Sequence, residues 1–323
     1  KGGNASGMKY GDTLSDDAFG GYEFDYVISN PPFGIDWKRE KSQVESEAKR
    51  GYDGRFGPGL PAISDGQMLF MLNGVKKLKE GSGRMAIIQN GSSLFTGDAG
   101  SGASEIRRYL IHEDLVEAIV QLPTDLFYNT GISTYIWVLT KGKPMSRSGR
   151  VQLIDASKCF VKRRKNIGSK RVDLDDACID LILKAYEGFD QNEVYTADDL
   201  VVESKVFEND FFGFTKVTVE TAQTDANGKL LLKKGKKLPV KGATDSEIIP
   251  LSDDIDAYMA KNVLPYNPLA YIDPAKDKIG YEIPFTRLFY KFEAPEPSAS
   301  IFEDIKALEA KETVLMKELF GNA

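Results

Sequence analysis

The segment Phe24-Asp25-Tyr26-Val27-Ile28-Ser29-Asn30-Pro31-Pro32-Phe33 is the part of this sequence that decides the fold. Residues 26–29 form a compact apolar run with the length and branching of a buried strand. The two prolines that follow remove two N–H donors and make the backbone rigid, so the strand has to end at Asn30. The segment therefore predicts a short buried strand whose carboxyl end carries an asparagine, two prolines and an aromatic ring.

Around this segment, strand and helix patterns alternate through the first 140 residues. The expected strands are residues 8–10, 84–88, 116–121 and 133–140, and the expected helices are residues 65–79 and 104–112. Strands separated by helices are typical of a mainly parallel, doubly wound α/β sheet. Ligands of such sheets bind at the carboxyl ends of the strands. Both Asp12 and Asn30 follow a predicted strand, so we expect them at that edge.

Three parts of the chain differ in their patterns. Residues 1–141 form the α/β part, residues 142–297 an α+β extension that begins at a basic, turn-rich junction, and residues 298–323 a terminal amphipathic helix. Within the extension we expect a helix at 175–186, a β-hairpin near 214–234 with its turn at Asn227-Gly228, and an extended connection at 265–284. The terminal helix is expected to pack on its own domain or on helices of a partner.

The composition excludes several classes of protein. Lys and Arg total 42 and Asp and Glu total 48, a formal charge of -6, which argues against a protein that coats nucleic acid by charge alone. The spacing of Cys159 and Cys178 fits no zinc or redox motif, and a zinc enzyme or a Ser-His-Asp hydrolase would depend on His112, the single histidine. With no apolar run near the roughly 20 residues that cross a bilayer and no signal peptide, we expect a soluble, cytoplasmic protein without membrane or metal contacts.

The tetrapeptide Asn30-Pro31-Pro32-Phe33 has the chemistry of a site that holds a planar amine. An asparagine amide oxygen and a proline carbonyl can together accept both hydrogens of an exocyclic amino group. Phe33 then offers a flat surface on which an aromatic ring can stack. At ordinary proline usage such a tetrapeptide occurs by chance in on the order of 1% of chains of this length. The alternative interpretation is a strand-ending turn with a buried phenylalanine.

On these residues the chain resembles the modification (M) subunit of type I restriction-modification systems, a family of N6-adenine DNA methyltransferases that use S-adenosylmethionine. The resemblance covers residues 8–141, 150–190 and 245–320, and is loose over 205–243. It implies a Rossmann-like methyltransferase sheet. The matching segments are Gly11-Asp12-Thr13-Leu14, 24–33, Ser64-Asp65-Gly66-Gln67, 83–88, 104–107, 122–134 and 283–287.

The resemblance also implies roles for the residues that hold the target base. The catalytic motif is Asn30, Pro31, Pro32 and Phe33, in which the Asn30 side chain and the Pro31 carbonyl grip the N6 amino group of an adenine. Phe33 stacks on that base once it is flipped out of the duplex. Phe127 covers the other face of the base, with Tyr128 as the alternative.

Two further residues are implied to bind the cofactor. Asp12 accepts a hydrogen bond from the adenine amino group of S-adenosylmethionine, and Phe70 packs against the same adenine. The implied reaction is a direct in-line methyl transfer to N6. It needs no strong general base if Asn30 and Pro31 orient the nitrogen lone pair.

The start of the chain departs from the family pattern. The glycine-rich loop and the acidic residue that binds the ribose lie upstream of the Gly-Asp-Thr-Leu segment in this family. We therefore expect a C-terminal fragment that lacks the N-terminal strands of the sheet, with residues 26–29 exposed at one edge. Half of the cofactor pocket would be absent, and whether this chain methylates DNA by itself stays open.

A basic segment at 158–171 supplies candidate DNA contacts. It contains no acidic residue and its cations are Lys158, Lys162, Arg163, Arg164, Lys165, Lys170 and Arg171. Lys162, Arg163, Arg164 and Lys165 are the candidates for contacts to phosphates, the alternative being a solvated surface loop.

The resemblance implies double-stranded DNA as substrate, and the specificity (S) and restriction (R) subunits of a type I complex as partners, with the S subunit docking partly through helices. Two alternatives are an amino-methyltransferase acting on protein glutamine or RNA, and a non-catalytic scaffold that binds the S subunit or DNA.

Overall fold

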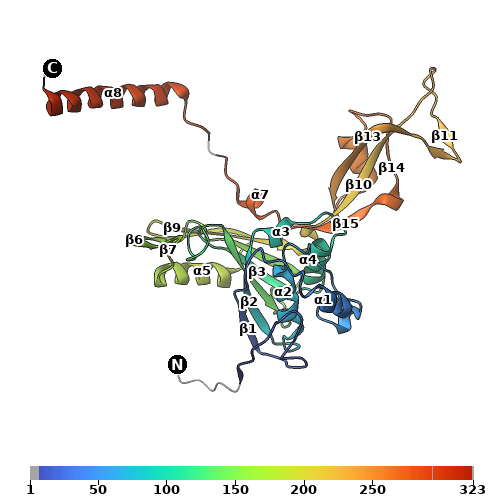
Figure 1. Ribbon diagram of the computed structural model, residues 1–323. Helices are drawn as coiled ribbons and strands as arrows, with labels where there is room; N and C mark the ends of the chain where they lie inside the picture. Colours follow the sequence, from blue (N-terminus) through green and yellow to red (C-terminus); the bar gives the residue numbers. More distant parts are fainter. Residues whose placement is uncertain (1–6, 293, 322–323) are drawn as a thin grey trace. The chain divides into compact units, whose positions relative to one another are not determined.

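A computed structural model describes residues 7–292 and 294–321 of the chain (Figure 1). The chain divides into two compact units, one that extends to Phe285 and one that begins at Thr286. The larger unit contains two main sheets, and the smaller unit consists mainly of one long helix.

The principal sheet of the larger unit has seven strands in the order β1-β2-β4-β3-β5-β9-β8. The strands are β1 (Tyr26–Ser29), β2 (Arg84–Asn90), β3 (Val116–Gln121), β4 (Thr134–Thr140), β5 (Arg150–Asp155), β8 (Asn192–Ala197) and β9 (Leu200–Glu208). β1 is parallel to β2 and β3 is parallel to β5, whereas β4 and β9 are antiparallel to both of their neighbours. Five of the seven strands therefore point the same way, which confirms the predicted α/β fold.

Helices connect these strands. They are α1 (Lys41–Ala48), α2 (Gln67–Lys76), α3 (Ser92–Phe95), α4 (Gly102–His112) and α5 (Asp176–Gly188). Three of them, α2, α4 and α5, lie where the sequence predicts helices, whereas α1 and α3 were not predicted. α2 buries Met68, Leu69 and Leu72 at helical spacing. The N-caps of α4 and α5 are Ser101 and Asp175, whose side chains accept hydrogen bonds from backbone N–H groups in the first turn.

β1 is the edge strand of the principal sheet, as predicted for residues 26–29, but the prediction that this strand is buried is wrong, because within the described residues only one of its edges pairs with a strand. Its side chains Tyr26 and Ile28 are 75% and 89% exposed. The strand expected at residues 8–10 is wrong, because this segment pairs with no strand of the described chain. A segment of three residues becomes a strand only when a neighbour satisfies its backbone hydrogen bonds, and Met8 and Tyr10 are exposed.

A second sheet is centred on β10 (Gly213–Ala222). β13 (Pro239–Pro250) pairs with one side of β10, and the short strands β14 (Ala270–Ile272) and β15 (Lys278–Tyr281) pair with the other. α6 (Ile255–Asn262) contributes Met259 to a core that it shares with Val217 and Ile249. Part of the connection expected to be extended at 265–284 is therefore built into this sheet.

The hairpin predicted near 214–234 has a different return strand. The Asn227-Gly228 turn closes only one bridge, between Thr224 and Leu230, and β10 pairs along its length with β13. Residues 229–237 are exposed, and they form part of a small ribbon of β11 (Leu232–Lys233) and β12 (Lys236–Lys237). β13 is the better partner because it contributes the buried Ile249 to the core.

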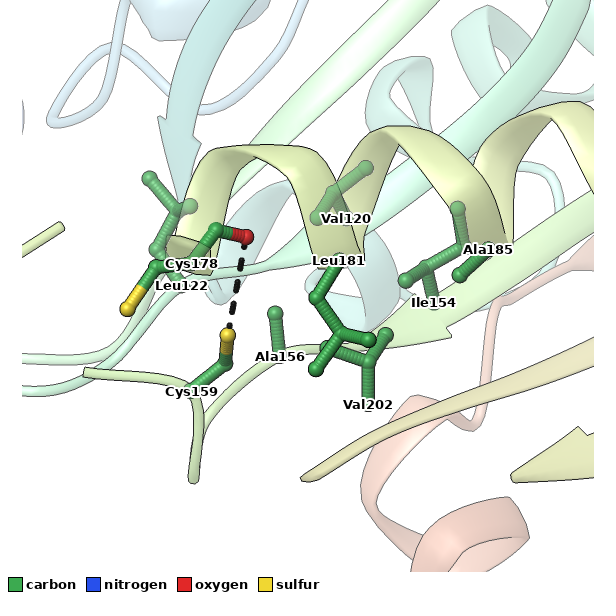
Figure 2. Close-up of a cluster of buried hydrophobic side chains, with 9 residues drawn as sticks. All are labelled: Val120, Leu122, Ile154, Ala156, Cys159, Cys178, Leu181, Ala185 and Val202. Atoms are coloured by element: carbon green, nitrogen blue, oxygen red, sulfur yellow. Dashed lines mark hydrogen bonds between the residues drawn. The ribbon is translucent and has the colours of Figure 1, made fainter. Parts of the chain in front are cut away.

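α5 packs on the principal sheet through the buried cluster drawn in Figure 2. The thiol of Cys159 lies 3.6 Å from the backbone oxygen of Cys178, and both cysteines are free. Burial raises the pKa of Cys159 to about 12, so the thiol is uncharged and serves as a small apolar core residue. The cluster consists of Val120, Leu122, Ile154, Ala156, Cys159, Cys178, Leu181, Ala185 and Val202.

The smaller unit contains the terminal helix α8 (Ser298–Phe320), which confirms the helix predicted for this region. α7 (Phe285–Phe289) lies between β15 and α8 in the chain. None of the described residues of α8 is buried, and the exposed side chains include Ile301, Ile305 and Leu308. Among the residues that the structure describes, no helix is long and apolar enough to span a membrane.

Candidate functional site

Three segments meet at one edge of the principal sheet and line a cavity of about 650 Å³. They are the carboxyl end of β1, the carboxyl end of β2, and the connection between β3 and β4. Register explains the first two, since Ser29 at the end of β1 is paired with Ile87 of the parallel strand β2. The lining residues are Asn30, Pro31, Pro32, Phe33, Gly34, Asn90, Phe127, Tyr128, Asn129, Thr130 and Ile132.

All four residues of the predicted catalytic motif lie in this lining. Asn30 and Pro32 are exposed, Phe33 is half-buried and Pro31 is buried, so the motif is anchored at Pro31. Phe127 and its alternative Tyr128, which are predicted to cover the other face of the base, line the same cavity although they lie about 95 positions later in the sequence. The structure thus brings together an amide, a rigid backbone and three aromatic rings.

Asn90 is a lining residue that the sequence analysis did not identify. Its side-chain oxygen accepts hydrogen bonds from Gln67 Nε2 at 2.8 Å and from the N–H and hydroxyl of Ser92 at 2.9 and 2.7 Å. Its own N–H donates to Gln67 Oε1 at 3.1 Å. The buried Gln67 also donates to the Asp65 carboxylate at 2.7 Å. The Ser64–Gln67 segment, noted for its resemblance, therefore positions Asn90.

Phe127 and Tyr128 are carried by a tight loop of residues 125–131, which we call the aromatic loop. Asp125 has φ 57°, and its N–H donates to the carbonyl of Gly131 at 3.4 Å. A Cβ at residue 131 would lie 2.6 Å from Asp125 Oδ1, so a larger residue there would have to displace the Asp125 side chain. The ring of Phe127 packs against the cluster of Figure 2, while Tyr128 is 57% exposed.

The basic segment forms a two-stranded hairpin of β6 (Val161–Ile167) and β7 (Lys170–Asp173). Lys162, Arg164 and Lys165 are exposed on it. The fourth candidate DNA contact, Arg163, forms an ion pair with the Asp173 carboxylate. Lys170, another cation of the segment, donates to the carbonyl of Leu126 at 3.0 Å. The hairpin therefore touches the aromatic loop.

The two residues assigned to the cofactor lie apart from this cavity. Asp12 is exposed, and its Oδ1 accepts the N–H groups of Leu14 and Ser15 at 2.8 and 3.1 Å. Neither Asp12 nor Phe70 is among the lining residues. The cavity thus contains the residues predicted to hold the amine, but not the two residues predicted to bind the cofactor.

The lining of the cavity decides what chemistry it can perform. None of its described residues is Asp, Glu, His, Lys or Arg. Neutral amides and aromatic rings suit the binding of an uncharged, planar group by hydrogen bonds and stacking. Such a site can orient an amine for attack, but it offers no strong general base within the lining.

Comparisons with known proteins agree on one family. A profile of the N-6 DNA Methylase family matches residues 2–227, which is more than half of the chain. The MjaIX type I restriction enzyme methylase subunit of Methanocaldococcus jannaschii is 29% identical over 162 residues, 50% of this chain and 28% of that protein. The HindI type I restriction enzyme methylase subunit of Haemophilus influenzae is 26% identical over 245 residues, 75% of this chain and 51% of that protein.

One solved structure gives the same result at the level of the fold. The methyltransferase subunit of a type I restriction-modification system from Streptococcus thermophilus is 29% identical, with a TM-score of 0.50. The match covers 62% of this chain and 38% of that chain. This chain spans between 28% and 51% of the length of the two curated relatives.

Proposed function

Because the chain belongs to the N-6 DNA methylase family, we propose that it is part of the modification subunit of a type I restriction-modification complex, which methylates N6 of adenine in double-stranded DNA. The observation that carries this proposal is the shared cavity of Asn30, Pro31, Phe33 and the aromatic loop. The description of the family, N-6 DNA Methylase, supports DNA as the substrate over protein glutamine or RNA.

The lining residues act on a flipped adenine. Asn30 Oδ1 and the Pro31 carbonyl accept the two N6 hydrogens, which turns the nitrogen lone pair out of the ring plane toward the methyl group. Pro32 keeps this backbone rigid, and Phe33 stacks on one face of the base while Phe127 or Tyr128 covers the other. S-adenosylmethionine, with Asp12 and Phe70 at its adenine, would supply the methyl group from its sulfonium.

Two exposed elements of the chain are assigned to partners. Lys162, Arg163, Arg164 and Lys165 of the hairpin contact phosphates of the duplex. α8 presents exposed apolar side chains that can dock on helices of the S subunit, and the R subunit joins the same complex. The complex acts in the cytoplasm.

The test is methyl incorporation into unmodified duplex DNA by the complete modification subunit with its S subunit. Replacing Asn30 by Ala removes an acceptor that orients the amine, so incorporation is expected to fall about 100-fold or more. Asn192→Ala, an exposed asparagine of β8, is the matched control and keeps full activity. Unchanged incorporation by N30A refutes the site. Complex formation by the wild-type protein with no incorporation supports the non-catalytic scaffold.

A further inference from the structure

The turn of the β6–β7 hairpin is hydrogen-bonded to the aromatic loop through three consecutive residues. The Ser169 N–H donates to the Tyr128 carbonyl at 2.9 Å, and the Arg171 N–H donates to the Asp125 carbonyl at 2.8 Å. Between them, Lys170 Nζ donates to the Leu126 carbonyl at 3.0 Å. The hairpin thus donates hydrogen bonds to three of the four backbone carbonyl groups at residues 125–128 of the aromatic loop.

The shape of the turn is adapted to this contact. Gly168 has φ 59°, a left-handed conformation, and a Cβ at this position would lie 2.5 Å from the Tyr128 carbonyl oxygen. Only glycine combines that backbone conformation with so close an approach. Any larger residue would separate the turn from the loop.

Lys170 differs from the other cations of the hairpin in the direction that it faces. Its side chain is 14% exposed, and Nζ also pairs with Asp173 Oδ1 at 2.9 Å. The same ammonium lies 5.6 Å from the centroid of the Tyr128 ring, within the range of a cation–π interaction. Lys162, Arg164 and Lys165 are exposed to solvent instead. The hairpin therefore has charges for a phosphate backbone and one cation that contacts the loop.

We propose that residues 168–171, which are the turn of the hairpin and the start of β7, position the aromatic loop, and that Lys170 links phosphate binding by the hairpin to the placement of Phe127 and Tyr128 over the flipped base. This inference rests on the proposed function. A displacement of the hairpin on DNA has to move the loop with it or break the three hydrogen bonds. Lys170 is thus a positioning residue, because it acts on the base through Leu126 and Tyr128.

The experiment compares variants of the complete modification subunit with its S subunit. Lys170→Met removes the ammonium and keeps the length of the side chain, Lys170→Arg keeps the charge, and Lys165→Met is the control for an exposed cation of the same hairpin. Hydrogen exchange of the amides at 126–131 reports on the loop. Methylation kinetics, resolved into kcat and KM for DNA, and 2-aminopurine fluorescence at the target base report on its placement.

K170M is expected to speed exchange in the loop about ten-fold and to lower kcat about 10- to 100-fold with little change in KM. K170R restores kcat, and K165M raises KM alone by about two- to ten-fold. Gly168→Ala, which forces the turn off the loop without removing a charge, reproduces the loss of kcat if K170M does not fold.

Two results overturn the inference. One is unchanged loop exchange and kcat in K170M and G168A, and the other is a K170M phenotype confined to KM, as in K165M. Absence of methylation by the wild-type complex refutes the proposed function instead, and loop exchange still tests the contact between hairpin and loop.

Discussion

Phe127 and Tyr128 are neighbours in the aromatic loop, but different surroundings hold their rings. Phe127 is partly buried against the cluster that includes Val120 and Leu181, so its position follows from core packing. Tyr128 is 57% exposed and its ring is near only one cation, Lys170, among the described contacts. The Phe127 ring should therefore contribute more to the free energy of unfolding than the Tyr128 ring does.

We predict that Phe127→Ala lowers both stability and methylation, whereas Tyr128→Ala lowers methylation alone. Loss of the half-buried phenylalanine ring should reduce the free energy of unfolding by about 2 kcal/mol. The exposed tyrosine should change it by less than about 0.5 kcal/mol. Urea denaturation and methyl incorporation measure the two effects. Equal destabilisation by both variants would contradict this division.

Gln67 is a second residue whose effect can be separated from its neighbours. Gln67→Ala leaves the Asn90 N–H without its partner and removes one of the donors to the Asp65 carboxylate, which should cost about 1–3 kcal/mol of unfolding free energy. Asn90 would also lose its fixed position in the cavity, so methylation should decrease. Gln191→Ala, at an exposed position, is the control and should be neutral in urea denaturation. A neutral Q67A variant would show that the network does not hold Asn90.

At the scale of elements, two ion pairs connect separate segments of the chain. Glu47 of α1 pairs with Arg55, and Asp17, which precedes β1, pairs with Lys77 at the end of α2. Arg55 contacts Glu47 at 2.6 Å, and Lys77 contacts Asp17 at 2.6 Å. Burial raises the pKa of both carboxyl groups, but hydrogen bonds from Lys77 and Arg55 outweigh it, so the pKa of Asp17 lies below 3.8 and that of Glu47 below 4.5. The contacts thus stabilise the fold only while both groups are ionised.

The sign of the pH dependence follows from these lowered pKa values. Their contribution is complete above pH 4.5, the ordinary value for Glu47, and is lost as the pH falls through the lower folded-state values. Urea denaturation between pH 6 and pH 2 should therefore show a free energy of unfolding that declines below about pH 5. Glu47→Gln should flatten the decline, whereas Glu45→Gln, on the exposed side of α1, should not. Identical pH profiles for E47Q and the wild-type chain would contradict this assignment.

At the scale of the whole molecule, the principal sheet ends at β1 in the part of the chain that the structure describes. β1 pairs with β2 on one side, and within the described residues no strand covers the other. Its exposed Tyr26 and Ile28 make this edge apolar as well as rich in free backbone groups. Such edges add strands from other chains unless a charge or a covering segment prevents it.

We expect this chain by itself to associate as its concentration rises. Ile28→Lys places a charge on the edge and should reduce association, as measured by sedimentation velocity over a range of concentrations. Ile179→Lys is the control, because Ile179 is 44% exposed on α5, where backbone groups are already paired. If both variants associate alike, the contact lies elsewhere on the surface.

The sequence by itself determined the local features of this protein. The strand at Tyr26–Ser29 ends at Asn30 because Pro31 and Pro32 cannot continue it. α5 begins directly after its N-cap Asp175, where the sequence predicts the helix, whereas α4 begins at Gly102, two residues before the predicted start. The amine binding that we propose for Asn30 and Phe33 likewise depends on residues that are close together in the sequence. Such signals act over a few positions, so they can be seen without the fold.

The tertiary structure alone decided how distant segments complete the site. Asn90 is held by Gln67, 23 positions earlier in the chain. Lys170 contacts the aromatic loop, although in the sequence it is one of seven Lys and Arg residues of the same basic segment. β10 pairs with β13 and not with residues 229–234, because β13 supplies the buried side chain. These outcomes depend on burial and on hydrogen bonds between separate segments, which no local pattern encodes.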